Sequence, residues 1–372
     1  MKKLLALTLL SLLACDLWKS ESVHSRLFVI RVDTLSGYIN QSGQVVITPR
    51  FRGATDFSEG LARVSGSYVD SLGPRWGFID ESGQEVLSQQ FASVGPFCDG
   101  LAQIGVPVDE EHRVGYINRA GDTVIKPQFE SARDFSEGMA VVNIGGYYHG
   151  KFGFIDKTGR LVIGYQFDDA DGFREGLAPV KVGKLWGYVD KTGRFAVEPQ
   201  FSNASWFSEG LAAVSVGDSW GSIDKSGKLV INPQFMGAVG SFSGGLALMW
   251  ALDSTNFLHY GYIDARGNVV ISPQFPLALD FSEGLAAVCD GSRWGFIDKT
   301  GKYVINPQFG WADSFSDGLA QVRQDGTGYV GYTDRSGAYV WGPFSYGGTE
   351  PDRPMPSGVA GGRSTSEVRE FR

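Results

Sequence analysis

A single motif recurs nine times along the chain, and this repetition limits the possible fold more than any other feature. One copy begins with Trp-Gly-Phe-Ile-Asp at 294–298 and ends with Val-Ile-Asn-Pro-Gln-Phe at 304–309. The glycine of the first element stands at Gly37, Gly77, Gly115, Gly153, Gly187, Gly221, Gly261, Gly295 and Gly331. A fixed period of about 20–50 residues is typical of solenoids, propellers and similar arrays. The chain is therefore predicted to be one repeat domain.

Variation in unit length is confined to one segment of each unit. The distance from the repeated glycine to the phenylalanine of Pro-Gln-Phe is 14 residues in eight units and 13 in the last. The gap before that glycine ranges from 10 residues, between Leu211 and Gly221, to 16, between Leu61 and Gly77. Insertions are tolerated where backbone is exposed. One loop per unit is thus free to vary, and the rest forms a framework.

Each unit is predicted to be a meander of three strands. In the sixth unit these are Leu211–Val216, residues 220–224 and Leu229–Ile231. Asp-x-x-Gly between the second and third strands is turn chemistry. Pro233 is expected to end the third strand because it has no N–H for the ladder. Gly221 is expected to leave room for an aromatic ring of the neighbouring unit.

A meander of this size cannot bury its own faces, so the units are expected to stack. The predicted fold is all-β, a tandem array of nine three-stranded meanders over residues 27–344. It could close like a propeller, although about 4–8 blades is typical, or continue as an open twisted solenoid. The open form is favoured because each end holds a whole unit. Residues 345–372, rich in Gly, Pro, Ser and Arg, are predicted to be a disordered tail.

The first residues have the composition of an export signal. Lys2 and Lys3 precede an apolar run that is too short for a membrane-spanning helix, which needs about 20 residues. Residues 1–14 are therefore predicted to be a signal peptide. The segment ending at Cys15 resembles the lipobox of bacterial lipoproteins, which implies cleavage before Cys15 and acylation of its thiol. Residues 15–26 would be a linker, and the protein would be exported and anchored in a membrane, facing the periplasm or the cell surface. An ordinary signal peptide with a chance cysteine is the alternative.

Charge and composition exclude several functions. The net charge of −8 argues against binding to nucleic acid, which needs a basic face. Four histidines and three cysteines leave little material for a metal site or a thiol nucleophile. Cys98 and Cys289 lie at different phases of the repeat, so we expect two unpaired thiols. No nucleophile elbow, phosphate-binding loop or His-Glu-x-x-His sequence occurs. We expect no enzyme activity, no cofactor and no metal.

These units resemble the WG (KWG) repeat family of bacterial proteins over 318 of the 372 residues. The pair that names the family occurs as Trp76-Gly77, Trp186-Gly187, Trp220-Gly221 and Trp294-Gly295. Other units have Ser36, Val114, Phe152, Tyr260 or Val330 in place of the tryptophan. The resemblance implies a repeat protein that is often exported, and it brings no catalytic residues.

Two repeated residue types could form sites, but each has a structural interpretation. The acids that begin the Asp-x-x-Gly turns could bind calcium, yet asparagine replaces them in two units and starts turns equally well. These acids are Asp80, Asp156, Asp190, Asp224, Asp264, Asp298 and Asp334. The acids before the link glycine, such as Glu137, are interpreted in the same way. The phenylalanines of the link could stack sugars, but we expect them to form core between units. They are Phe57, Phe135, Phe173, Phe207, Phe281 and Phe315.

The variable loops are the predicted binding surface, because stacking in register would bring every loop tip to one edge. The candidate partner-binding residues are Tyr68, Tyr147, Tyr148, His149, Phe257 and Tyr260. The histidines of these loops differ in register, which argues against a metal site. We therefore predict a non-enzymatic, envelope-anchored scaffold that binds an envelope protein. A module that binds cell wall or polysaccharide is the alternative.

Overall fold

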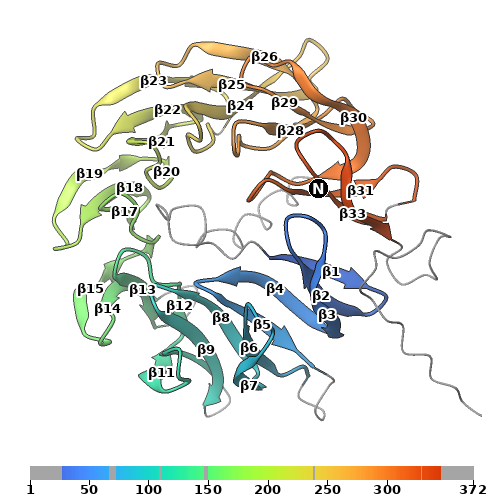
Figure 1. Cartoon of the computed structure of the whole chain (residues 1–372). Coiled ribbons are helices and arrows are strands. Elements are labelled where there is room, and N and C mark those ends of the chain that lie inside the picture. The colour runs from blue at the N-terminus through green and yellow to red at the C-terminus, as the bar shows by residue number, and fades with distance from the viewer. Residues whose placement is uncertain are drawn as a thin grey trace, which may run out of the picture.

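The computed structural model describes residues 27–66, 73–108, 111–145, 150–237, 239–327 and 329–344. The predicted signal peptide, linker and tail all lie outside these residues. The described residues form strands, turns and loops, and no helix among them could cross a membrane. The nine units follow one another as blades around a central opening (Figure 1).

Blade 4 shows the structure of a unit. It contains β12 (Ser131–Ala132), β13 (Met139–Ile144), β14 (Lys151–Asp156) and β15 (Leu161–Phe167), hydrogen-bonded in that order and antiparallel. The predicted three-stranded meander is β13–β15. The short β12 is an additional innermost strand, formed by the chain just after the preceding Pro-Gln-Phe. The chain thus passes from the outermost strand of one blade to the innermost strand of the next.

The first blades have the following strands from the inside outward. Blade 1 has β1 (Phe28–Val32), β2 (Leu35–Ile39) and β3 (Val45–Phe51). Blade 2 has β4 (Gly53–Ser58), β5 (Leu61–Ser65), β6 (Trp76–Asp80) and β7 (Glu85–Phe91). Blade 3 has β8 (Ser93–Cys98), β9 (Leu101–Val108), β10 (Glu111–Ile117) and β11 (Thr123–Phe129).

The later blades repeat this order. Blade 5 has β16 (Asp169–Ala170), β17 (Leu177–Val182), β18 (Leu185–Asp190) and β19 (Phe195–Phe201). Blade 6 has β20 (Asn203–Ala204), β21 (Leu211–Val216), β22 (Ser219–Asp224) and β23 (Leu229–Phe235). Blade 7 has β24 (Leu246–Leu252), β25 (Leu258–Asp264) and β26 (Val269–Phe275). Blade 8 has β27 (Leu277–Ala278), β28 (Ala286–Cys289), β29 (Trp294–Ile297) and the start of β30 (Tyr303–Ala312). Blade 9 has the end of β30, then β31 (Ala320–Gln324), β32 (Val330–Thr333) and β33 (Tyr339–Phe344).

The first and last blades meet and complete the ring. The Tyr332 hydroxyl donates a hydrogen bond of 2.8 Å to the carbonyl oxygen of Val29, and the rings of Phe28 and Tyr332 are 5.5 Å apart. Side chains of both blades, including Ile39 and Trp341, share one buried cluster. The geometry is therefore propeller-like, and the open form that the sequence favoured is wrong. Closure depends on the angle between blades, which no local sequence pattern encodes.

The repeated glycine is required by the backbone of its own blade. The pairing between β18 and β19 shifts register between Trp186 and Tyr188, which marks a β-bulge. A Cβ added to Gly187 would lie 2.5 Å from the Val197 carbonyl oxygen and 2.7 Å from the Pro199 nitrogen. The expectation of a neighbouring aromatic ring is therefore wrong. Pro199 lies inside β19 and does not end it, because an outermost strand with a bulge tolerates a missing N–H.

The Asp-x-x-Gly turn and the link turn both contain residues with positive φ. In the predicted Asp-x-x-Gly turn, Asp190 Oδ1 accepts backbone hydrogen bonds of 2.8 Å from Thr192 and 3.1 Å from Arg194, and Gly193 has φ +82°. The link between the innermost strand and the next is a two-residue turn in which Glu175 (φ 52°) and Gly176 (φ 86°) both have positive φ. This is the type I′ geometry that suits the twist of a hairpin.

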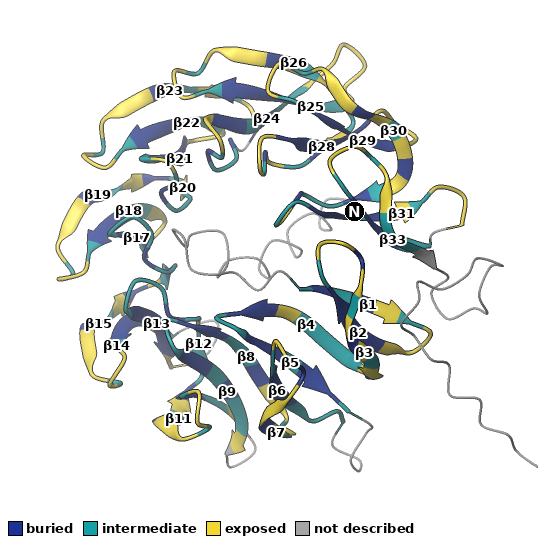
Figure 2. Cartoon of the chain, viewed as in Figure 1, coloured by how far each residue is buried: buried dark blue, intermediate teal, exposed yellow. Residues whose placement is uncertain are grey.

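Aromatic pairs join successive blades. The ring of Tyr188 in blade 5 lies 4.9 Å from the link ring of Phe207 in blade 6, and Phe296 of blade 8 lies 4.7 Å from Phe315 of blade 9. The core therefore lies between blades, and exposed residues gather on the outermost strands (Figure 2). Cys289 is buried and free as expected, whereas Cys98 forms a disulfide, so the unpaired thiol expected there is wrong.

Candidate functional site

The repeated aspartates are structural, as the sequence predicted. Asp156 Oδ1 accepts hydrogen bonds from the Thr158 backbone and hydroxyl and from the Arg160 backbone. The Thr158 hydroxyl contributes most to lowering the pKa of Asp156, to about 2. Within the described ranges no group of three or more His, Cys, Asp or Glu side chains could hold a metal ion. The hydrogen bonds show that these acids start turns.

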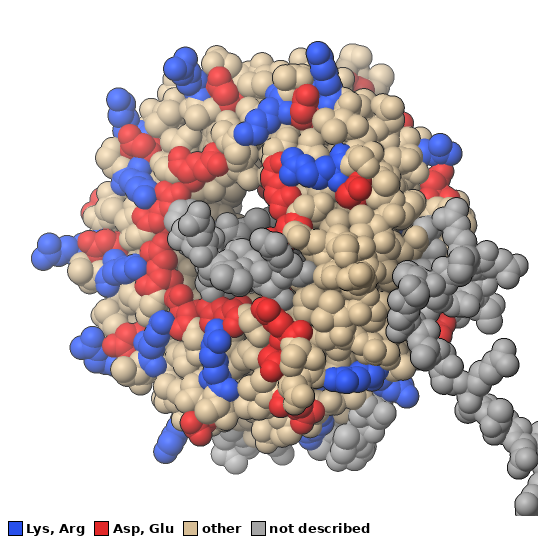
Figure 3. Space-filling view, viewed as in Figure 1, with Lys and Arg blue, Asp and Glu red and all other residues tan. Residues whose placement is uncertain are grey.

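The repeated link acids join neighbouring blades. Glu137 Oε2 of blade 4 accepts a hydrogen bond of 3.0 Å from the backbone N–H of Gly176 in blade 5, and Lys191 lies 3.2 Å from the same oxygen. The same clasp, from acid to link glycine, occurs as Glu59–Gly100, Asp99–Gly138, Glu175–Gly210, Glu209–Gly245 and Glu283–Gly318. On the face shown in Figure 3, acidic side chains gather around the central opening. The turn interpretation is confirmed, and the carboxylates also hold adjacent blades together.

The link phenylalanines form core, as predicted. Their exposed fraction is at most 8 % in each of the six blades named above, as in Phe57. Buried rings cannot stack against a polysaccharide. The repeated tryptophans lie on the third strand and are half-buried or, at Trp294, buried against the next blade.

The predicted partner-binding residues are only partly within the described chain. Phe257 is 69 % exposed at the tip of the β24–β25 hairpin. Tyr260 is not at a tip: it lies in β25, half-buried opposite Trp250 and Phe275. Tyr68, Tyr147, Tyr148, His149 and the lipidation candidate Cys15 lie outside the described residues.

The hairpins between the second and third strands emerge on one face of the ring. Strands alternate in direction, so these hairpins point away from the link turns and the Asp-x-x-Gly turns. A contact between the latter two confirms that they share a face: Arg119 of a blade 3 turn donates to the carbonyl oxygen of Glu59 in a blade 2 link. We call the surface made by the second-to-third-strand hairpins the hairpin face.

In blade 2 and blades 4 to 9, a corner that faces the next blade is occupied by an aromatic side chain. Three positions form it: the start of the innermost strand, the fifth residue of the second strand and the repeated tryptophan position. In blade 2 the ring of Trp76 lies beside Gly53 and fills the corner. Blades 4 to 9 have an aromatic residue at one or more of these positions, namely Phe152, Trp186, Trp220, Trp250, Tyr260, Trp294 and Trp311, whereas blade 1 has Arg31 and Ser36.

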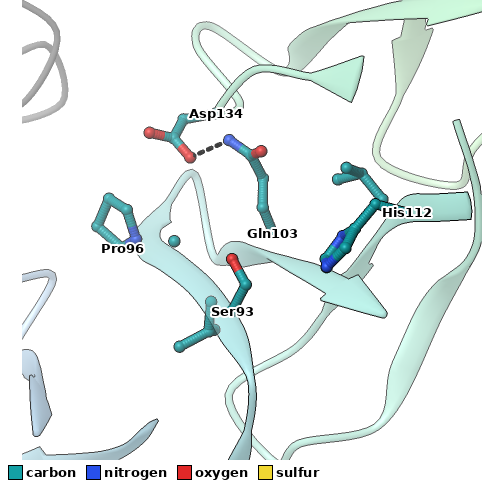
Figure 4. A pocket seen from close by; sticks show the side chains of 9 residues that line it. Ser93, Pro96, Gln103, His112 and Asp134 are labelled. Atoms are coloured by element: carbon teal, nitrogen blue, oxygen red, sulfur yellow. Dashed lines mark hydrogen bonds between the residues drawn. The ribbon is translucent and has the colours of Figure 1, made fainter. Parts of the chain in front are cut away.

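Blade 3 has no aromatic residue at this corner. Its three positions are Ser93, Gly105 and Val114. A cavity of about 240 Å³ remains between blades 3 and 4 (Figure 4). It is lined by Ser93, Val94, Gly95, Pro96, Gln103, Gly105, His112, Val114 and Asp134. The absence of an aromatic residue from all three positions of this unit is a signal that an alignment of the nine units could have revealed, and sequence reasoning missed it.

Asp134 is the charged group of this cavity. Its Oδ1 accepts a hydrogen bond of 2.5 Å from Gln103 Nε2, which joins blade 4 to blade 3 (Figure 4). Burial raises the pKa of Asp134, while the Gln103 hydrogen bond and the charge of Arg63 lower it less. Arg63 of blade 2 donates instead to the Val94 carbonyl oxygen at 2.9 Å.

Comparison with known proteins supports the repeat and the fold. Residues 37–65, 76–105, 115–148, 152–186, 186–220, 220–249, 260–294 and 294–327 match the WG containing repeat. No curated protein matches this chain. The crystal structure of the eukaryotic initiation factor is similar with a TM-score of 0.53 at 15 % identity, covering 76 % of this chain and 85 % of that one. Kluyveromyces lactis Hsv2p has a TM-score of 0.36 at 12 % identity, covering 55 % and 74 % of the two chains. The WD40 domain of Toxoplasma gondii coronin has 0.32 at 10 %, covering 63 % and 77 %.

Proposed function

Because the chain belongs to the WG-containing repeat family, we propose that it is a non-enzymatic scaffold that binds another protein through its hairpin face. One observation carries this proposal: the repeated side chains form the turns, the contacts between blades and the core of the ring. The aspartates start turns, the link acids join blades and the link phenylalanines are buried. The side chains that vary from blade to blade remain available for binding a partner, and many of them lie in the hairpins between the second and third strands.

Phe257 supports a protein partner. A phenylalanine with 69 % of its surface exposed at a hairpin tip is typical of a contact residue, because aromatic side chains are enriched at protein interfaces. Polysaccharide binding through the framework rings lacks support, since those rings are buried. No described feature favours that second function.

A crosslinking experiment tests the hairpin face. A photoreactive phenylalanine analogue at position 257 is expected to crosslink to one discrete envelope protein, and Phe257→Ser should reduce capture of that protein. The matched control is position 270, because Val270 is 44 % exposed on the outer strand β26 of the same blade. Equal crosslinking from both positions would contradict the proposal. Retention of the protein on purified cell-wall sacculi would instead favour the polysaccharide alternative.

We also propose that Cys15 carries the lipid that anchors the scaffold in the envelope. Mass spectrometry of the N-terminal peptide should show an acylated cysteine as the first residue. The chain has three cysteines, Cys289 is free and Cys98 forms a disulfide, so a lipid on Cys15 requires that Cys98 pairs with a cysteine of another molecule. A Cys15–Cys98 disulfide in place of the lipid is the result that would contradict anchoring.

A further inference from the structure

We propose that the cavity between blades 3 and 4 binds the ammonium or guanidinium group of a lysine or arginine side chain presented by the partner protein. This inference rests on the proposed function, and it adds a specific chemistry to the interaction. Asp134 is the counter-ion, and the unfilled corner of blade 3 receives the side chain.

The carboxylate of Asp134 lacks a cationic partner. One oxygen is held by the Gln103 amide, and among the described residues no ion pair to Asp134 is formed. Arg63 is the cation that acts on it, but the guanidinium donates to a backbone carbonyl instead. A shielded carboxylate is unfavourable unless it is paired and hydrogen-bonded. An incoming cation would supply the missing partner with a charge-assisted hydrogen bond.

The walls of the cavity suit an aliphatic stem that carries a charged end. Val94, Pro96 and Val114 provide apolar surface, as the methylene groups of lysine and arginine require. About 240 Å³ corresponds to roughly eight water molecules at about 30 Å³ each. His112 is exposed, and its ring lies against Gly105, where an added Cβ would be 2.9 Å from Cε1.

The interface between blades 7 and 8 shows what makes this cavity specific. Asp280 occupies the position of Asp134, and an added Cβ on Gly240 would lie 3.0 Å from its Oδ1, compared with 3.1 Å for Gly95 and Asp134. However, the corner of blade 7 is occupied by Trp250. Asp56 of blade 2 occupies the same position at the interface with blade 1, where Arg31 and Ser36 stand at the corner positions. The cavity of about 240 Å³ lies beside Asp134, between blades 3 and 4.

Methyl NMR of the full-length chain with labelled valines tests the inference. The probes are the Nα-acetyl methylamides of lysine and arginine, and the same derivative of norleucine is the uncharged control. We expect saturable shifts of the Val94 and Val114 methyl signals with both cationic probes and none with norleucine. Asp134→Asn should weaken binding at least tenfold, whereas the matched Asp280→Asn should bind as the wild type does.

A second variant separates loss of the site from loss of the fold. Val114→Trp restores the tryptophan that other blades carry at this position, so the chain should stay folded while the Val94 methyl signal no longer responds. Equal response to norleucine, unchanged binding by Asp134→Asn, or no response of the wild type would each overturn the inference. The probes need no partner protein, so these failures are distinguishable from failure of crosslinking at position 257.

Discussion

The interface between blades 3 and 4 and that between blades 7 and 8 have an aspartate at the same position but differ beside it. Asp134 is next to Gln103, Gly105 and a cavity. Asp280 has Leu248 and Trp250 at the corresponding positions of blade 7. The comparison shows that the residues at the corner of a blade can change while the fold of the blade stays the same. Function in such a ring is therefore expected where one blade departs from the others.

The largest effect is expected from the framework that both interfaces share. Gly115→Ala and Gly261→Ala would place a Cβ 2.5 and 2.4 Å from a backbone carbonyl oxygen of the neighbouring outer strand. Each should lower the free energy of unfolding by about 3 kcal/mol, as expected for overpacking against backbone. Urea denaturation measures this. Gly164→Ala is the control because no atom lies within 4 Å of its added Cβ. If Gly164→Ala lowers the free energy of unfolding as much as Gly115→Ala does, backbone contact at the bulge is not the reason for the repeated glycine.

A smaller effect is expected when blade 7 is made to resemble blade 3. Trp250→Gly removes a half-buried ring, and should cost about 2 kcal/mol and leave a cavity beside Asp280. Urea denaturation gives the cost, and the lysine and arginine probes test the new cavity. If the variant loses no stability, the ring does not fill the corner as we describe.

Replacing Asp280 or Asp134 with asparagine should stabilise the protein above about pH 6, and the gain should differ between the two variants. Burial raises the pKa of Asp280 to about 6, so the folded state binds this proton more tightly than the unfolded state. Stability from this group therefore falls as the pH rises from about 4 to 6. Asp280→Asn should gain about 1 kcal/mol at pH 7.5, a value reduced because solvent reaches the residue, and nothing below about pH 4.

Asp134→Asn should show a smaller gain, because the Gln103 hydrogen bond and Arg63 oppose the effect of burial on its pKa. Thermal unfolding of both variants across pH 3–8 measures the two gains. A gain at low pH, or a larger gain for Asp134→Asn, would contradict this assignment.

The smallest effect concerns the clasp that one interface has and the other lacks. Asp99 Oδ2 accepts a hydrogen bond of 2.7 Å from the Gly138 N–H, while blade 7 has Gly244 at the same position. Asp99→Gly should cost about 0.5 kcal/mol, because the lost hydrogen bond is partly offset by relief of a positive φ of 53°. Urea denaturation measures it, and a stabilised variant would show that the clasp contributes nothing.

Much of the blade could be predicted from local sequence. The Asp-x-x-Gly turns, the three main strands and the burial of the link phenylalanines follow from turn chemistry and period-two patterning. The innermost strand could not be predicted, because β12 has only two residues and forms only by pairing with β13 of its own blade. The reason for the repeated glycine was also missed, since a bulge brings residues 10 and 12 positions away against it, as Val197 and Pro199 lie against Gly187.

By itself the sequence determined the number of units, their register and the absence of obvious catalytic motifs, because each depends on residues close together in the chain. Only the tertiary structure decided that the ring closes through Tyr332 and Val29. It also decided that the link acids join blades and that the corner of blade 3 is unfilled. These properties depend on packing between units, where residues more than 30 positions apart meet, and such contacts leave little trace in a local pattern.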